Sequence, residues 1–511
     1  MSESEHGPAE SAKKAPLERL SGWFDDRLGL SYPMLRPAPA YSINPFYWLG
    51  ALAVIAFVIQ GITGMLMMVY YVPSPTQAYA TTQYIFQDVS YGTFLETVHL
   101  YTAYAMIMLA FMHMMRGYFV SVQKKPRELM WVVGMLMGFV TLGFGFTGYL
   151  LPWTVVSKSA TDVGTGMLNA LPTQVSSFLS FLVVGSGGDS GELLRFYDLH
   201  IVILPAALLA LLAVKMYMLE SHGVAEPVAS SVTAAKRKLI PIFPDVSFYL
   251  LELAALFGAA MLLISVIFPL SLPVEYSAQA AGAYTAQPDW YFLWVYQILK
   301  IQAFETWGLP VALGAITLVF LALIVLPFID RGETRLIAKR MKYITLGLIF
   351  VAEVAVLTVW GRLTPGQVIS NEQAVLVLGG TALLVALGSV VAYRLVFGGI
   401  SRATRASPPT GGAAIGAPSV QSALHSASLW TASSFVGLLV LGTFGISGSI
   451  GAVAGMMAAN ATSPALLDSL GASLALISVT VAGTAYLVYR LDLSTGSIKR
   501  RVRAFEVGWK E

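Results

Sequence analysis

Cysteine is absent from this 511-residue chain. Its absence excludes disulfides, iron–sulfur ligation by thiolates and haem attached through thioether bonds. Charged residues are also scarce, at 12%, whereas 56% of the residues are hydrophobic and the mean hydropathy is +0.70. This composition is far too apolar for a soluble protein of the same length, so it predicts a polytopic membrane protein. The net charge of +3 gives no indication of a nucleic-acid partner.

Long apolar stretches make up most of the sequence. Those long enough to cross a bilayer of about 30 Å as helices lie near 46–71, 95–121, 131–155, 198–220, 247–270, 309–328, 343–361, 373–398, 429–456 and 466–489. The expected fold class is therefore an all-α polytopic membrane protein with about ten transmembrane helices. The first 20 residues have no apolar core and are not expected to be a signal peptide.

Lysine and arginine are distributed unevenly between the connections, and this predicts the orientation of the chain. The connections 72–94 and 457–465 contain none, whereas basic residues follow the second, fourth, sixth and eighth stretches and end the chain. They are Lys124, Lys125, Arg127, Lys236, Arg237, Lys238, Arg331, Arg335, Lys339, Arg340, Arg402, Arg405, Lys499, Arg500, Arg501 and Arg503. Because basic connections stay in the cytoplasm, we expect both termini there.

Composition divides the chain into five parts. Residues 1–40 are expected to form a cytoplasmic arm, in which LERLSGWFDDRLGL has the pattern of an amphipathic helix lying on the membrane. Residues 41–228 are expected to form a four-helix bundle, and residues 229–400 a second membrane region. Residues 401–428 contain SPPTGGAAIGAPSV, which is typical of a flexible linker. Residues 429–511 are expected to form a two-helix hairpin and a basic tail.

The most informative pattern is a set of paired residues at one interval. Three pairs lie 14 positions apart, namely Gly50 with Gly64, His99 with His113, and Gly134 with Gly148. On the fourth stretch, Lys215 follows His200 by 15 positions. Helix of this length rises roughly 21 Å in about four turns, so the members of each pair share a face. A four-helix bundle of this kind suits two stacked haems, with imidazoles binding iron and glycines making room for the ring edges.

Plain packing is the alternative for these residues. A lone histidine on an apolar helix is more often a hydrogen-bonded core residue, and membrane helices use small residues simply to pack. However, His99, His113 and His200 are three of only six histidines, and all lie in predicted membrane stretches, where ionisable groups are costly. Because two glycine pairs repeat the histidine interval, we favour haem binding.

Several local strings resemble the cytochrome b family of quinol-oxidising respiratory and photosynthetic complexes. In family order, between residues 16 and 365, they are FVIQGITG, KKPRELMWV, GFTGYLLPW, RFYDLH, PDWYFLWVYQILK and LPFIDR. The 15-residue spacing and the WFDDRL segment look like the chloroplast-type branch, in which this region is usually two polypeptides. Here it is one fused chain, and the resemblance implies a multi-pass protein of a prokaryotic plasma membrane. The last two stretches match nothing in the family.

The expected haem ligands fall at two depths. His99 and His200 begin helices that enter from the outside, so we expect them to bind the outer haem. The inner pair is His113 with Lys215, and a lysine amine binds iron only when it is deprotonated, a form that burial favours. Two alternatives stay open, namely a five-coordinate haem on His113 with Lys215 extending toward the cytoplasm, or no inner haem. The same histidines would bind haem b or a modified haem A.

Two ionisable residues lie close to these ligands in the sequence. Arg116, one turn past His113, is expected to reach an inner haem propionate. The family usually carries a basic residue three positions before the first outer ligand, but that position here is Glu96. The partner of the outer propionates therefore stays open.

The string Pro288-Asp289-Trp290-Tyr291 stands where the family carries its outer quinol motif, usually with glutamate in the second place. The resemblance implies that Asp289 accepts a quinol proton as general base, with Tyr291 as its catalytic neighbour. The alternative is an interfacial turn rich in aromatic residues. The opposite wall is expected to contain Gly148, Leu151, Pro152 and Trp153.

An inner quinone site is expected near the cytoplasmic boundary. Its candidates are Glu220, Ser221, His222 and Asp245, and a solvated surface role is the alternative for each. Glu353 lies within the seventh stretch, where a helix-packing hydrogen bond is the expected role.

The predicted function is the haem-bearing membrane subunit of a quinol-oxidising complex. One quinol electron would leave to a Rieske iron–sulfur partner, and the other would cross the membrane through two haems to a quinone. Because the chain lacks cysteine, the iron–sulfur centre must belong to that partner. Cytochrome c or terminal oxidase subunits are the expected acceptors, and we expect a homodimeric complex surrounded by membrane lipid.

Two other functions explain part of the pattern. A di-haem membrane anchor of another respiratory enzyme would share the paired histidines without needing PDWY or GYLLPW. A transporter would share the helix count and would use Lys215 and Glu353 on an ion path, but it would not need glycines at the histidine interval.

Overall fold

The structure is a computed structural model that describes residues 37–39, 42–185, 188–223, 225, 239–285, 287–332, 334–335 and 339–405. The predicted arm (apart from Pro37–Pro39), most of the predicted linker and the C-terminal hairpin lie outside the described residues. Within the described ranges the chain forms two compact units. The described residues between 37 and 48 and between 239 and 260 belong to one unit, and those between 49 and 225 and between 261 and 405 belong to the other.

The first unit contains a small antiparallel sheet. Strand β1 (Pro37–Pro39) pairs with β2 (Leu239–Pro241), so that Ala38 lies opposite Ile240. The short helical segments η2 (Pro45–Tyr47) and η5 (Ile242–Val246) belong to the same unit, and α11 (Ser247–Ile267) begins in it.

The second unit is helical. In chain order its elements are α3 (Leu49–Met68), α4 (Ala78–Gln87), α5 (Gly92–Val120), α6 (Glu128–Leu150), α7 (Val155–Asn169), α8 (Thr173–Val183), α9 (Gly188–Asp198), η3 (Leu199–Ile203), α10 (Leu204–His222), α12 (Ala278–Ala283), η6 (Trp290–Phe292), α13 (Leu293–Leu299), α14 (Gln302–Trp307), α15 (Leu309–Ile329), α16 (Met341–Leu363), α17 (Asn371–Ala374), η8 (Val375–Gly379) and α18 (Gly380–Arg405).

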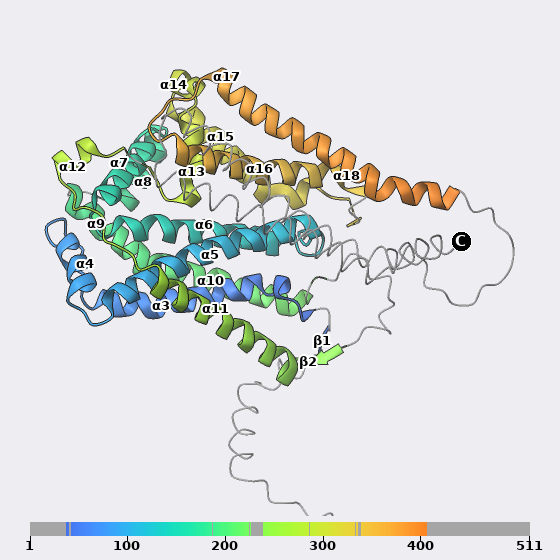
Figure 1. Cartoon of the computed structure of the whole chain (residues 1–511), viewed down its shortest axis with the longest axis horizontal. Coiled ribbons are helices and arrows are strands. Elements are labelled where there is room, and N and C mark those ends of the chain that lie inside the picture. Colours follow the sequence, from blue (N-terminus) through green and yellow to red (C-terminus); the bar gives the residue numbers. More distant parts are fainter. Residues whose placement is uncertain are drawn as a thin grey trace, which may run out of the picture. The chain divides into compact units, whose positions relative to one another are not determined.

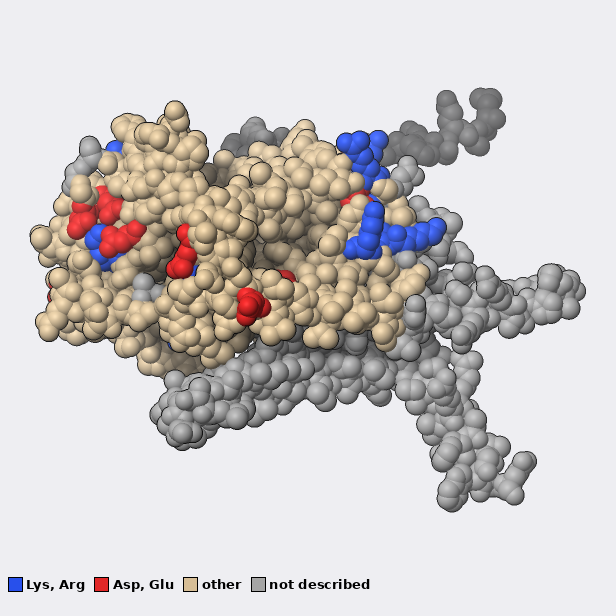
Figure 2. Space-filling model, turned by 90° about the horizontal axis from the view of Figure 1, so that it is seen from above, with Lys and Arg blue, Asp and Glu red and all other residues tan. Residues whose placement is uncertain are grey.

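Eight helices in the described part of the chain are long and apolar enough to cross a membrane. They confirm the all-α polytopic fold and correspond to the first eight predicted stretches, although the fourth is longer than predicted and runs over Gly188–His222. The predicted stretches 429–456 and 466–489 lie outside the described residues. On the face seen in Figure 2, lysine and arginine side chains gather at one end.

The four helices that carry the spaced residues pack as a bundle. Helix α3 packs along α5, α5 contacts α6, and α6 packs along α10 (Figure 1). Further along the chain, α16 packs against both α13 and α18 and also contacts α5. The contact with α5 is close, because a Cβ added to Gly347 would overlap the ring of Tyr118.

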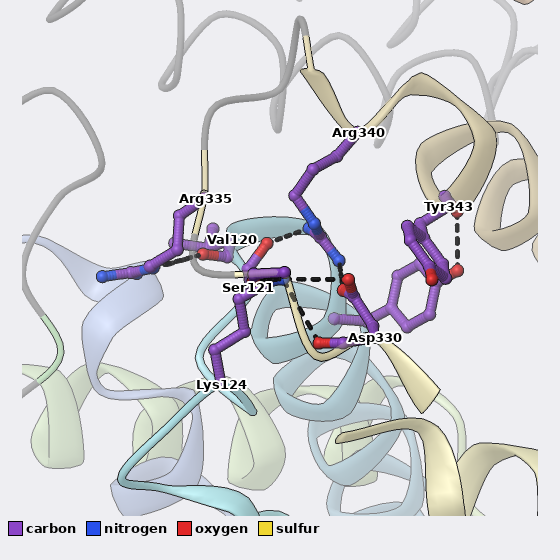
Figure 3. A network of polar contacts seen from close by, with 9 residues as sticks. Val120, Ser121, Lys124, Asp330, Arg335, Arg340 and Tyr343 are labelled. Atoms are coloured by element: carbon purple, nitrogen blue, oxygen red, sulfur yellow. Dashed lines mark hydrogen bonds and ion pairs between the residues drawn. The ribbon is translucent and has the colours of Figure 1, made fainter. Parts of the chain in front are cut away.

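A buried ionic network joins the end of α5 to the segment after α15 (Figure 3). The Asp330 carboxylate accepts from Lys124 Nζ at 2.9 Å and also from the guanidinium of Arg340. The side chains of all three are at most 7% exposed. Arg340 also donates to the hydroxyl of Ser121, which ends α5 in the left-handed conformation. A buried carboxylate shared by two cations holds these two distant parts of the chain together.

Candidate functional site

The spaced glycines of α3 lie directly against the spaced histidines of α5. A Cβ added to Gly64 would lie 3.4 Å from Cε1 of His99, and one added to Gly50 would lie 3.1 Å from Cε1 of His113. The earlier glycine meets the later histidine, as it must where neighbouring helices run in opposite directions. The shared 14-residue interval therefore produces two matched contacts, about four helical turns apart.

Helices α6 and α10 repeat this arrangement. A Cβ added to Gly148 would lie 2.7 Å from Cε1 of His200, and one added to Gly134 would lie 3.3 Å from Nζ of Lys215. Lys215 thus stands against a glycine in the same way as the three histidines. Its amine points toward the interior of the bundle and not along the outer surface.

A local irregularity explains why His200 and Lys215 are 15 and not 14 positions apart. The segment Leu199–Ile203 is a π-helix, in which the N–H of Leu204 bonds to the carbonyl of Leu199, five residues earlier. A π-bulge adds one residue without adding a turn, so 15 residues place the two side chains as 14 would in an α-helix. Pro205 favours the bulge because it has no N–H to donate within the next turn.

His99 and His200 face each other across the bundle. Their ring centroids are 6.4 Å apart and the rings are inclined at 63°. Two metal–nitrogen bonds of about 2 Å each, together with half of each ring, span a gap of this size. The two imidazoles therefore fit a haem held between them.

Two threonines hold these imidazoles. Thr63 Oγ1 lies 2.8 Å from Nδ1 of His99, and Thr147 Oγ1 lies 3.0 Å from Nδ1 of His200. Each hydroxyl already donates its single hydrogen to the carbonyl four residues earlier, at 2.8 Å in both cases. With its hydrogen on that carbonyl, each hydroxyl can accept from the histidine, an arrangement in which the proton lies on Nδ1 and Nε2 keeps its lone pair for a metal.

Sequence reasoning did not identify these threonines. The available signal was the Thr-Gly dipeptide, since Thr63 and Thr147 each precede the glycine that faces the same histidine. At the inner depth the corresponding residues are Leu49 and Val133, which have no hydroxyl.

The inner pair differs in its polar contacts. Nδ1 of His113 is buried and has no hydrogen-bond partner within the described residues. Lys215 and the predicted propionate partner Arg116 are the cations close to His113. The three predicted inner residues are thus brought together, whereas Glu96, at the outer depth, is only partly buried in the first turns of α5.

The predicted quinol residues form a compact polar cluster. Asp289 immediately precedes η6, and its Oδ1 accepts a hydrogen bond of 3.0 Å from the phenol of Tyr104 on α5. Tyr291 is 6% exposed, and its hydroxyl lies 3.3 Å from Oδ2 of Asp289 and 3.0 Å from the carbonyl oxygen of Gly145. Trp290 packs edge-on against both tyrosines. The sequence pointed to Asp289 and Tyr291, but not to Tyr104 or Gly145.

Burial raises the pKa of the Asp289 carboxyl above its ordinary value. The hydrogen bonds from Tyr104 and Tyr291, and the positive charge of Arg362, oppose that rise in pKa. A carboxylate whose pKa is raised is a stronger base than an ordinary aspartate, so it is better suited to accept a proton.

The predicted opposite wall is only partly near this cluster. Gly148 faces His200, and the residue that meets the Tyr291 ring is Gly145, one turn earlier on α6. Trp153 is buried against Ala78 and Leu193. Leu151 packs at the edge of the same group, and its carbonyl accepts from Tyr71 at 2.7 Å. Pro152, between Leu151 and Trp153, is partly buried.

Three of the four inner quinone candidates lie at the end of α10. Glu220, Ser221 and His222 are exposed, and His222 Nδ1 lies 2.9 Å from the carbonyl of Met218 in its own helix. Asp245 lies in the first unit, within η5. Glu353 lies in the middle of α16, where its Oε2 is buried without a hydrogen-bond partner in the described residues, so the predicted packing bond is not formed at that atom.

Comparisons with known proteins agree on one family. Residues 36–223 match the model described as cytochrome b/b6/petB, and residues 279–378 match cytochrome b(C-terminal)/b6/petD. The chain is 33% identical over 328 residues to a cytochrome bc complex cytochrome b subunit of Chlorobaculum thiosulfatiphilum, covering 62% of this chain and 75% of the relative. It is 38% identical over 192 residues to cytochrome b6 of Heliobacterium modesticaldum, covering 37% and 90%.

A solved structure has the same fold. The chain titled "Hyperthermophilic respiratory Complex III" matches with a TM-score of 0.57 and 23% sequence identity, over 75% of this chain and 98% of that chain. The match supports the architecture of the helices.

Proposed function

Because this chain belongs to the cytochrome b family, we propose that it passes electrons from quinol to a Rieske iron–sulfur partner and, through two haems, across the membrane. Family membership makes it the haem-bearing membrane subunit of a quinol-oxidising complex. The observation that carries the finer proposal is the set of four glycine contacts, two on histidines of α5 and two on His200 and Lys215. Neither a transporter nor a simple helix bundle requires glycines placed against these four side chains.

At the outer depth, His99 and His200 would hold a haem through Nε2. Thr63 and Thr147 support this role because they fix the Nδ1–H tautomer and orient both rings toward one gap. A haem in that gap would supply reversible one-electron chemistry.

At the inner depth, His113 and Lys215 would be the two ligands. The contact between Gly134 and the Lys215 amine favours this reading over a lysine that extends to the cytoplasm. Arg116 would neutralise a propionate from one turn further along α5. A five-coordinate haem on His113 alone is the second candidate, and an empty inner site is the third.

Asp289 would act as the general base of quinol oxidation. Its Oδ2 can take a proton from the quinol hydroxyl, and Tyr291 lies beside that oxygen. Pro288 and Trp290 would line the same pocket, with Gly148 on α6 and Pro152 and Trp153 just after this helix. Glu220, His222 and Asp245 stay the candidates for a second, inner quinone site.

The first partner in this proposal follows from the missing cysteine. The iron–sulfur centre belongs to a Rieske protein, and its electrons continue to cytochrome c or to a terminal oxidase. The complex would be a homodimer in a prokaryotic plasma membrane, with both termini of this chain in the cytoplasm. The largest group of lysine and arginine side chains on the face seen in Figure 2 lies at one end, which supports that orientation.

A reduced-minus-oxidised absorption spectrum of the purified complex tests this proposal. Two haem components per chain, reducible by quinol and lost stepwise in His99 and His113 variants, are the expected result. A chain without haem bands would instead favour the transporter. Two haems that quinol does not reduce, even with the complete complex, would favour a di-haem anchor of another respiratory enzyme.

A further inference from the structure

Tyr104 joins the helix that carries His99 to the predicted quinol motif. It lies on α5, five residues after His99, and its hydroxyl donates to Asp289 Oδ1 at 3.0 Å. Its ring packs edge-on against Trp290, with centroids 6.2 Å apart at 79°, and at the same centroid distance against Tyr291. The ring contacts hold the aromatic ring of Tyr104, and the hydrogen bond holds its hydroxyl.

The two carboxylate oxygens of Asp289 have different partners. In the described part of the chain, the single hydrogen of the Tyr104 hydroxyl has one acceptor, Oδ1 of Asp289. The Tyr291 hydroxyl has two possible acceptors, and the Gly145 carbonyl at 3.0 Å is closer than Oδ2 at 3.3 Å. When Tyr291 donates to Gly145, its oxygen is left as an acceptor beside Oδ2.

We propose that Tyr104 is the positioning residue for the quinol base: its phenol holds Oδ1 of Asp289, so that the carboxylate stays ionised and presents Oδ2 to the substrate. This inference rests on the proposed function of Asp289. In the reaction, the quinol O–H bond breaks and an Oδ2–H bond forms, while the electrons leave along the paths already described. The new Oδ2–H can then donate to the Tyr291 oxygen, and this hydrogen bond stabilises the protonated form of Asp289.

Few charged groups surround Asp289, so the effect of the Tyr104 hydrogen bond on its pKa can be distinguished from the effects of neighbouring charges. The groups that face it are Tyr104 on α5, Tyr149 on α6, Tyr284 before the motif, Tyr291 on η6 and Arg362 on α16. Among these groups Arg362 is the cation, and Tyr104 and Tyr291 are the two whose hydroxyls lie within hydrogen-bond distance of the carboxylate. Removing the Tyr104 donor destabilises the charged form, so the pKa of Asp289 rises further above its ordinary value.

The matched experiment compares Tyr104→Phe with Tyr101→Phe in the whole complex. In Tyr104→Phe the ring that packs against Trp290 is kept and only the hydroxyl is lost. Tyr101→Phe is the control, because the Tyr101 hydroxyl donates to the carbonyl of Phe268 and not to Asp289. The protonated carboxyl band that disappears in Asp289→Asn is followed by infrared difference spectroscopy across pH. Oxidation of menadiol is measured over the same pH range.

We expect Tyr104→Phe to raise the midpoint of the Asp289 band by about one to two pH units, the size of one hydrogen bond to a charged group. The acid limb of kcat for menadiol should move by the same amount, with little change in KM, whereas Tyr101→Phe should move neither. Tyr104→3-fluorotyrosine, a stronger donor, should move both in the opposite direction.

The outcomes separate the two proposals. A shifted carboxyl band with an unshifted kcat limb would confirm the hydrogen bond from Tyr104 to Asp289, but it would remove Asp289 from quinol chemistry and with it the positioning role of Tyr104. An unshifted band in both Tyr104 variants, with normal haem content, would overturn the inference whatever the turnover.

Discussion

Gly148 is in direct contact with the imidazole of His200: a Cβ at position 148 would lie 2.7 Å from Cε1 and 3.3 Å from Nε2 of the ring. The ring has little freedom to move away, because Thr147, the neighbour of Gly148, holds its Nδ1. A single methyl group at this position must therefore displace the ring from the gap that it shares with His99.

Gly148→Ala should remove most of the outer haem while leaving the inner haem in place. The matched control on the same helix is Gly138→Ala, because a Cβ at position 138 meets nothing within 4 Å. Haem content measured from the pyridine haemochrome spectrum, per mole of purified chain, decides the matter. Full haem content in Gly148→Ala would show that the contact with His200 does not shape the site.

Thr147→Val should raise the reduction potential of the outer haem. An imidazole that donates Nδ1–H is a stronger base at Nε2, and stronger bases favour the oxidised iron. We expect a rise of up to about 60 mV, equivalent to a tenfold change in a one-electron equilibrium. Redox titration of the spectrum measures it, and Thr141→Val, which removes a hydroxyl bonded only within α6, is the control. Equal potentials in the two variants would contradict the tautomer assignment.

Lys215 variants test the inner ligand pair through the spin state of the iron. With Lys215 as sixth ligand, the inner haem should be low-spin in the native protein, high-spin in Lys215→Ala and low-spin again in Lys215→His. Electron paramagnetic resonance distinguishes these states without requiring turnover. If the native protein and Lys215→Ala had the same high-spin signal, the five-coordinate haem on His113 would be the correct reading.

Asp289→Asn should slow quinol oxidation at least tenfold and leave both haem spectra intact, because a carboxamide cannot accept the proton. Since burial raises the pKa of Asp289, the native rate should fall as the pH drops through that raised pKa, and the variant should lack this limb. Asp88→Asn, at the exposed end of α4, is the control in a steady-state assay across pH. Native turnover in Asp289→Asn would exclude the aspartate as the base.

Asp330→Asn should destabilise the protein by about 3–5 kcal/mol, because it leaves the buried cations Lys124 and Arg340 without their shared carboxylate. The control is Asp162→Asn, since this partner of Lys158 is more than half exposed and its ion pair should contribute less than about 1 kcal/mol. Unfolding in mixed detergent micelles compares the two variants. Equal free energies of unfolding would mean that the network in Figure 3 does not hold the two segments together.

Two properties of this protein could be read from its sequence. Apolar length and the scarcity of charge predicted the membrane helices, because a bilayer accepts only backbone that satisfies its own hydrogen bonds. The equal intervals of His99 with His113 and of Gly134 with Gly148 predicted shared faces at two depths, because helical rise and twist are the same in every helix. Both inferences depend on local geometry alone.

The tertiary structure decided which residues meet. Nothing in the sequence pairs Gly64 with His99 or places the hydroxyl of Thr63 at its Nδ1, because these contacts arise only when α3 and α5 pack in one register. The bond between Tyr104 and Asp289 joins residues 185 positions apart. Such contacts depend on how whole helices pack against one another, and that packing is a balance over many side chains that no single interval in the sequence records.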